Sequence, residues 1–381
     1  MQRLLQYSIT VAILTGTCAA ADEVFTKDDV KLNAILADLD SADFDTRQSA
    51  QEQLRQLTAG QLIFLAEHAK TSRSAESAVR CVQALEHHFM NDDSSQAIAA
   101  FEALYALVNC ERAVVREQVA WVLSHRWKKR IQLATDQLKQ YGALIVLPDA
   151  AVAAQKMHRQ RQADPQGLRQ RGLVVRARSS DQALQVFLTD EWHGDEEALR
   201  LLQRLPERQF QDGQAFGANG ERGGRLIGGR NGPPSVSVFL VSGHPLNEDA
   251  EAWVKRVPGN SIQERGSVML GITSYGGIVG DGCVIRAIVP FGSGDAAGLQ
   301  SADKITAVEK QSIAGFDELV HELRQFTAGE MVEITFERSS SIAGQPLVSE
   351  SINVRLRSWK DYVKSTNQAA AEYKAAMRLP K

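Results

Sequence analysis

Residues 282–299 read GCVIRAIVPFGSGDAAGL, and they carry the clearest secondary-structure pattern in the C-terminal part of the chain. Its first half, 283–289, has the apolar spacing of a strand, and Pro290 ends that strand because proline cannot donate to a β-ladder. Its second half, 291–299, predicts a loop, one short helix and a glycine stop. From residue 266 onward, the chain therefore changes to short strands separated by glycine turns.

The flanking residues contain further short elements of the same domain. Each has the apolar spacing of a strand or of an amphipathic helix. They are strands at 268–272, 304–308, 332–336 and 352–356 and a helix at 316–326. The predicted order over residues 266–358 is strand, strand, helix, strand, helix, strand, strand.

That series resembles a bacterial PDZ domain of the type attached to proteases of the HtrA/DegP family. The resemblance is carried by Arg265-Gly266 with Leu270-Gly271-Ile272, by 282–290, by Ala296-Ala297-Gly298-Leu299 and by Asp303-Lys304-Ile305. Two positions depart from the family pattern. Ala302 replaces the usual glycine, and Glu309-Lys310 replaces an Asn-Gly turn, so we expect a distorted hairpin there. The implied fold is a partly open β-barrel with two helices.

The resemblance also implies a binding site in which a guest peptide adds a strand to an open sheet edge. The edge is expected at Ile272, Thr273 and Ser274, and the loop that holds a terminal carboxylate at Met269, Leu270 and Gly271. The helix would supply the opposite wall through Phe316, Leu319, Val320 and Leu323. Because this wall is mostly aliphatic, we expect guests that end in Val, Leu, Ile or Ala. The alternative is that another segment, such as 339–350, occupies the edge.

Catalytic motifs of the proteases that carry such domains are missing from the sequence. It contains no Gly-x-Ser-Gly-Gly loop and no His-Glu-x-x-His motif, and too few residues follow the domain for a Ser-Lys catalytic unit. We therefore expect no enzymatic activity, no cofactor and no metal site.

The N-terminal part, residues 22–142, predicts packed helices, as an α-solenoid of HEAT character or as a plain helical bundle. Leucines recur at helical spacing, and residues 45–50 followed by Leu54 resemble the HEAT-repeat pattern. The basic cluster Arg126, Lys128, Lys129 and Arg130 is expected to be a solvated helix face or a complement to the helix dipole.

The middle region, residues 143–265, contains an internal repeat. Residues 184–188 match 236–240 at an offset of 52, and each copy continues into an amphipathic helix and a proline. This duplication predicts βα units with a small parallel sheet, which resembles degenerate leucine-rich repeats without their Asn/Leu ladder. The glycine-rich residues 212–234 are interpreted as a flexible insertion rather than a phosphate loop.

The first residues, 1–21, predict a cleaved signal peptide, with Arg3, an apolar stretch and small residues at 18–21. A lipoprotein anchor on Cys18 is the less favoured alternative. We therefore expect a periplasmic or secreted protein with no stable membrane insertion after cleavage. With a net charge of −3, nucleic acid is not an expected partner.

Three cysteines follow the predicted cleavage site, so at least one thiol remains unpaired unless it bonds to another chain. Cys81 and Cys110 fall in helices of one region, where pairing is an open alternative, and Cys283 is expected in a core. The last residues, 359–381, predict a helix. Either Trp359, Tyr362, Val363, Tyr373 and Met377 seat it on the body, or it is a frayed tail.

These observations favour a multidomain α+β, non-catalytic exported protein that binds peptide or protein C-termini, with the helical domain engaging a second partner. Two alternatives stay open. One is a structural scaffold whose groove is occupied by the chain itself, and the other is a regulatory subunit of a separate periplasmic protease.

Overall fold

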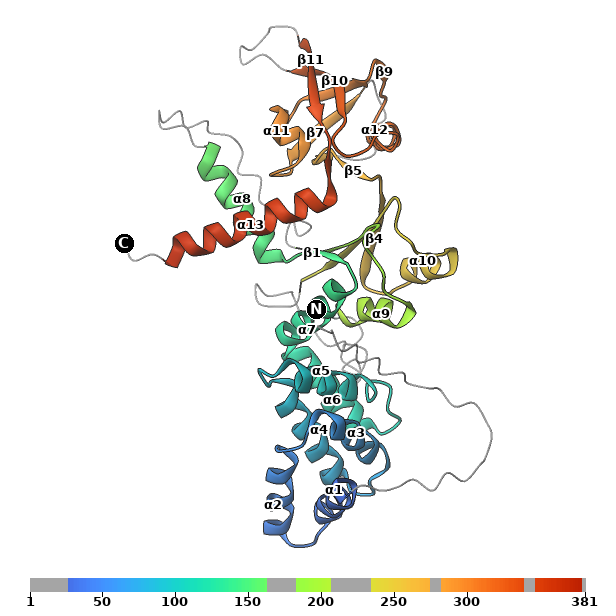
Figure 1. The fold of residues 1–381 in the computed structure, drawn as a ribbon, viewed down its shortest axis with the longest axis vertical. Helices are drawn as coiled ribbons and strands as arrows, with labels where there is room; N and C mark the ends of the chain where they lie inside the picture. Colours follow the sequence, from blue (N-terminus) through green and yellow to red (C-terminus); the bar gives the residue numbers. More distant parts are fainter. Residues whose placement is uncertain (1–26, 163–182, 207–233, 275–281, 339–346, 379–381) are drawn as a thin grey trace, which may run out of the picture.

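The computed structural model describes residues 27–162, 183–206, 234–274, 282–338 and 347–378. The chain is of mixed α+β type and elongated, with helices at one end, a sheet in the middle and a second sheet at the other end (Figure 1). The predicted signal peptide lies outside the described residues, as do nearly all of the glycine-rich insertion and most of the 339–350 segment. Within the described part, no helix combines the length and apolar character needed to cross a membrane.

Seven helices form the N-terminal end. They are α1 (Lys27–Asp38), α2 (Phe44–Leu54), α3 (Leu62–Thr71), α4 (Ala75–Phe89), α5 (Ser94–Tyr105), α6 (Ala113–His125) and α7 (Trp127–Gln140). Short polar side chains start several of them, since Asp43, Ser74 and Asp93 each accept a hydrogen bond from a backbone N–H of the first turn. Helix α4 lies at the centre and contacts α2, α3, α5 and α6.

The middle sheet has the order β1 (Leu144–Val146), β2 (Leu184–Leu188), β3 (Val236–Val241), β4 (Asn260–Arg265). Strand β1 is antiparallel to β2, whereas β2, β3 and β4 run parallel. Leu184 pairs with Val236, so the internal repeat of the sequence is the register of the sheet, and the predicted parallel pairing is confirmed. The helices α9 (Glu196–Arg200) and α10 (Glu248–Lys255) follow β2 and β3.

One face of this sheet shares a continuous core with the N-terminal helices. Arg130 of α7 takes part in the junction. It is wholly buried, and its Nη1 donates to the carbonyl oxygens of Arg204, at 2.5 Å, and of Pro206, at 3.1 Å. The prediction that Arg130 is solvated was therefore wrong. The carbonyl groups at the end of the 3₁₀ turn Leu201–Arg204 need donors, and Arg130 on the inner face of α7 supplies them.

The other face of the sheet is covered by α8 (Pro148–Gln162) and α13 (Trp359–Arg378), which pack against each other (Figure 1). Tyr362 and Val363 are buried in this cluster, so the C-terminal helix is seated on the body rather than frayed. Met377, also expected to seat the helix, is 69% exposed and does not do so.

The C-terminal sheet has the order β11-β10-β8-β7-β6. Its elements are β6 (Ile272–Ser274), β7 (Cys283–Ile288), α11 (Ser293–Ala297), β8 (Lys304–Val308), β9 (Gln311–Ser312), α12 (Phe316–Leu323), β10 (Met331–Arg338) and β11 (Val348–Arg355). A separate two-stranded sheet joins β5 (Val268–Met269) to β12 (Arg357–Ser358). In the described residues β6 and β11 are the two outer strands and do not pair with each other, so the large sheet is open.

The two departures from the expected motif keep the backbone that glycine would have adopted. Ala302 has a φ of 75°, and Glu309 and Lys310 have φ values of 47° and 69°. Two consecutive positive φ values are the geometry of a two-residue hairpin turn, and Val308 pairs with Gln311 across it. The expected distortion of this hairpin is therefore not found.

All three described cysteines, Cys81, Cys110 and Cys283, are buried and free. The alternative of a Cys81–Cys110 disulfide is therefore not realised in this structure.

Candidate functional site

A groove lies between the outer strand β6 and helix α12, and it opens into a cavity of about 330 Å³. Nine of the expected binding residues line this one cavity: Met269, Leu270, Gly271, Ile272, Thr273, Phe316, Leu319, Val320 and Leu323. Ser274 does not line it. It follows an irregularity in the β6–β7 ladder and pairs with Ile285.

The loop between β5 and β6 is held by its carbonyl groups. Ser293 Oγ donates to Met269 O at 2.6 Å, Gly294 N donates to Leu270 O at 2.7 Å, and Val289 N donates to Gly271 O at 2.8 Å. In a trans peptide unit the C=O and the next N–H point in opposite directions. The N–H groups of residues 270–272 therefore point away from these donors, and the three residues themselves line the cavity. Successive backbone amides in such a turn can form an anion-binding concavity.

Gly271 is required for this loop. Its φ is +79°, a conformation that residues with a side chain rarely adopt. A Cβ at this position would also lie 2.8 Å from the Cα of Gly292, whose backbone packs directly against it.

Ile272 offers the backbone groups for strand addition. Because Gly271 O bonds Val289 N, the next pair along the antiparallel ladder, Ile272 with Ile288, is a non-hydrogen-bonded pair. The N–H and C=O of Ile272 therefore point to the open edge. In the described residues, β6 pairs with β7 alone, so this edge is not occupied by a described strand.

Arg265, at the end of β4, was not among the binding residues expected from the sequence. It lines the cavity, and its guanidinium donates to Gln263 Oε1 and lies 5.5 Å from the ring centre of Phe239. Burial, and then the charge of Arg324, lower the pKa of Arg265. Among the described residues no carboxylate pairs with it, because Glu264 on the same strand bonds Lys255 instead. A partly buried guanidinium without a counter-ion favours an anionic ligand.

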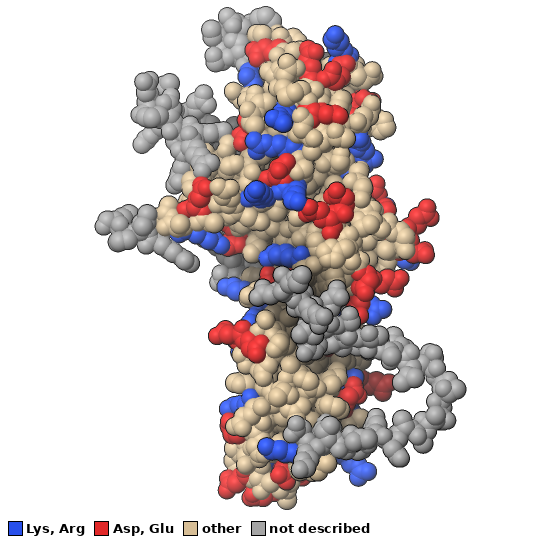
Figure 2. Space-filling view, in the orientation of Figure 1, with Lys and Arg blue, Asp and Glu red and all other residues tan. Residues whose placement is uncertain are grey.

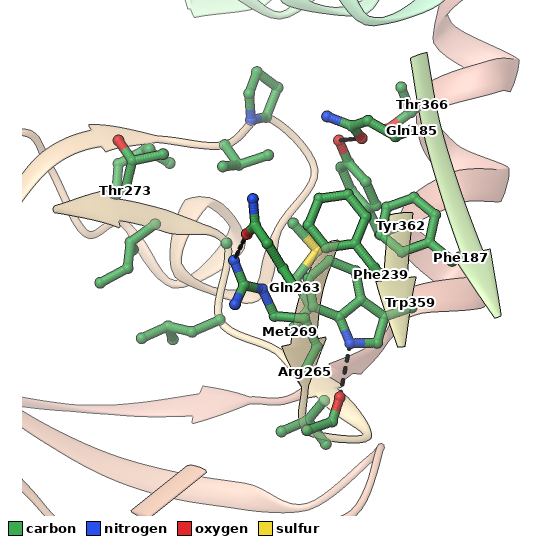
Figure 3. Close-up of a pocket in the computed structure, with 18 of the residues that line it drawn as sticks. Gln185, Phe187, Phe239, Gln263, Arg265, Met269, Thr273, Trp359, Tyr362 and Thr366 are labelled. Atoms are coloured by element: carbon green, nitrogen blue, oxygen red, sulfur yellow. Dashed lines mark hydrogen bonds between the residues drawn. The ribbon is translucent and has the colours of Figure 1, made fainter. Parts of the chain in front are cut away.

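Beyond Arg265 the cavity continues into a space that we call the aromatic chamber, which is lined by Phe187, Phe239, Trp359 and Tyr362. Phe187 stacks on Phe239 at 4.6 Å and on Trp359 at 5.1 Å between ring centres. Figure 3 shows Thr273 on one side, these rings on the other side, and Arg265 with Gln263 between them.

The chamber follows from the alternation of side chains in the middle sheet. Residues 185 and 187 of β2, 237 and 239 of β3, and 263 and 265 of β4 all face the cavity. The equivalence of Phe187 and Phe239 in the internal repeat was the one available sequence signal for it.

Trp359 joins the chamber to the loop between β5 and β6, which we call the binding loop (residues 269–271). Its Nε1 donates to Gly266 O at 2.9 Å, and the adjoining strand β12 pairs with β5. The position of the loop therefore depends on α13 as well as on its own domain.

Acidic and basic side chains are interspersed over the face of the molecule in Figure 2. Within the described residues, no group of three His, Cys, Asp or Glu side chains is placed to hold a metal ion. No protein-family model matches the chain, and no curated protein matches it.

Proposed function

We propose that the chain is an exported, non-catalytic protein that binds the C-terminal ends of peptides or proteins by strand addition to β6. The resemblance to PDZ domains and the geometry of the groove support this function together. The guest would lie between β6 and α12, with aliphatic side chains against Leu319, Val320 and Leu323.

The observation that carries the proposal is the arrangement of donors at the end of the groove. The N–H groups of residues 270–272 point away from the groups that bond the neighbouring carbonyls, and these residues line the cavity. Arg265, which has no carboxylate partner among the described residues, lines the same cavity. An extended chain in the middle of its sequence brings no negative charge to this place, whereas a terminal carboxylate does. Charge-assisted hydrogen bonds to that carboxylate would add affinity beyond the strand pairing.

In this proposal the N-terminal helices, of HEAT character, hold a second protein partner, and the predicted signal peptide directs the chain to the periplasm or to the outside of the cell. A separate protease is one class of partner. The scaffold alternative stays open, because most of the 339–350 segment named for it lies outside the described residues.

A comparison of two forms of one peptide tests the proposal. A fluorescent decapeptide ending in Val is titrated into the full-length chain, once with a free C-terminal carboxylate and once with a C-terminal amide. We expect the amide to bind at least about 10-fold more weakly, since it removes charge-assisted bonds.

The variant Arg265→Met should narrow that ratio to about 2-fold, because the remaining donors are uncharged amides. Arg256→Met is the matched control, since Arg256 is exposed, does not line the cavity and should leave the ratio unchanged. Equal affinity of the two peptide forms for the unmodified chain would refute carboxylate recognition. Absence of any binding, across a set of C-terminal sequences, would refute peptide binding itself.

A further inference from the structure

The two faces of the β6–β7 hairpin pack against different clusters. Ile272 and Ile288 contact the core of the C-terminal domain beneath α12. Val289, directly after β7, contacts the cluster formed by α8, α13 and the middle sheet. Alternate side chains of a strand added to the edge of β6 would therefore face the core of the C-terminal domain and the cluster of α8, α13 and the middle sheet.

The register in which a guest strand pairs with β6 determines which face of the hairpin each guest side chain lies on. The outward N–H and C=O of Ile272 would bond the last guest residue, and directly paired residues place their side chains on the same face. The last guest side chain thus enters the aliphatic pocket with Ile272. The side chain before it lies on the opposite face, with Thr273, because successive side chains in a strand alternate.

Thr273 shares its cavity with the aromatic chamber. The same cavity is lined by Ala151 and Ala154 of α8, by Phe239 and by Arg265. The chamber contains a further polar group, because Thr366 of α13 is 2% exposed and its Oγ1 has no partner within the described residues. The space beside Thr273 is therefore bounded by aromatic rings, small alanines, a cation and a free hydroxyl.

We propose that the aromatic chamber is a subsite for the penultimate residue of the guest, and that it selects an aromatic side chain at that position. This inference rests on the proposed function and specifies its ligand. A Phe, Tyr or Trp side chain matches the chamber because it packs against the rings and over the guanidinium of Arg265. The guest class is then a C-terminal sequence with an aromatic residue followed by an aliphatic one.

Three peptides that differ only in their last two residues test the assignment. They end in Phe-Val, Ala-Val and Val-Phe and are titrated into the full-length chain by fluorescence anisotropy. We expect Phe-Val to bind about 10-fold more tightly than Ala-Val, from the added aromatic contacts. Val-Phe should not show this gain, because the register places its aromatic ring in the aliphatic pocket.

The variant Ala151→Trp fills the chamber from α8, and we expect it to reduce the preference for Phe-Val to less than about 2-fold while Ala-Val binding is retained. Val152→Trp is the matched control, since Val152 is the next residue of α8 and does not line the cavity. Thermal unfolding of both variants verifies that they are folded.

Equal binding of Phe-Val and Ala-Val to the unmodified chain overturns the subsite and leaves the proposed function intact. A preference for Phe-Val that survives in Ala151→Trp also overturns it. Failure of all three peptides to bind counts against the proposed function itself.

Discussion

At the scale of single residues, the binding loop depends on two glycines in contact, Gly271 and Gly292. The carbonyl groups of residues 269–271 reach their donors on Val289 and on α11 because the two backbones approach to a distance that excludes a Cβ. The same approach leaves the N–H groups of residues 270–272 pointing away from these donors. The positive φ of Gly271 and the proposed carboxylate site are therefore coupled.

Gly271→Ala should destabilise the protein more than Gly298→Ala. Both glycines have positive φ, at 79° and 86°, so each variant strains the backbone by about 1 kcal/mol. Only at position 271 does the added Cβ also meet backbone, at 2.8 Å, whereas nothing lies within 4 Å at position 298. We expect a total loss of about 3 kcal/mol for Gly271→Ala. Urea unfolding measures both losses, and similar values would contradict the contact argument.

At the scale of elements, the sequence predicted those segments whose signal is local. The strands β2 and β3 were predictable because the chain repeats them, and their register follows directly from the offset of the repeat. The groove was predictable in part, because the resembling motifs lie within one stretch that contains β6 and α12.

Pairings between distant elements were not predictable. The predicted strand 268–272 is divided into β5 and the start of β6, and β5 pairs with the two-residue strand β12 across the whole domain. Helices α8 and α13 face each other although Asp149 and Lys374, which pair between them at 2.6 Å, are far apart in sequence. The aromatic chamber was missed for the same reason, since its rings come from β2, β3 and α13.

Arg130 of α7 illustrates how a charged side chain can join elements. Arg130→Met should reduce the free energy of unfolding by about 3 kcal/mol, because buried carbonyl groups near Arg204 and Pro206 lose a charged donor. Lys128→Met, at an exposed position of the same helix, should change it by less than about 0.5 kcal/mol. Guanidinium unfolding of the two variants measures the difference. If Arg130→Met leaves the free energy of unfolding unchanged, water replaces the arginine at these carbonyl groups.

In the whole molecule, three buried clusters organise the part of the chain that the structure describes. The first unites the N-terminal helices with one face of the middle sheet, and the second is the core of the C-terminal domain. The third lies between the other face of the middle sheet, α8 and α13, and it includes Met269 of the binding loop. Because the proposed ligand cavity borders the second and third clusters, guest binding should depend on how firmly the two are joined.

Two cysteines report on these parts separately, because Cys81 lies in the first cluster and Cys283 in the second. Burial raises the pKa of the Cys81 thiol to about 12 and also raises the pKa of Cys283. At neutral pH both thiols are therefore protonated and shielded, and each should react with an alkylating reagent only after its own cluster opens.

Trp359→Ala should loosen the C-terminal domain while leaving the N-terminal core intact. The variant removes the stacking on Phe187 and the hydrogen bond to Gly266. Truncating a large aromatic side chain in this way should lower the stability of the domain by about 3 kcal/mol. If the free energy that opposes opening of the C-terminal domain falls by that amount, labelling of Cys283 should accelerate about 100-fold. Labelling of Cys81 should stay within about 2-fold, because its cluster does not include Trp359.

Met377→Ala provides the control for this experiment, since Met377 lies on the same helix and is 69% exposed. It should leave both labelling rates unchanged, as measured by mass spectrometry of the alkylated peptides. Equal acceleration at Cys81 and Cys283 in Trp359→Ala would mean that the chain opens as one unit, and the third cluster would then be part of a single cooperative core. Acceleration confined to Cys283 would identify Trp359 as the residue through which the middle sheet stabilises the binding loop.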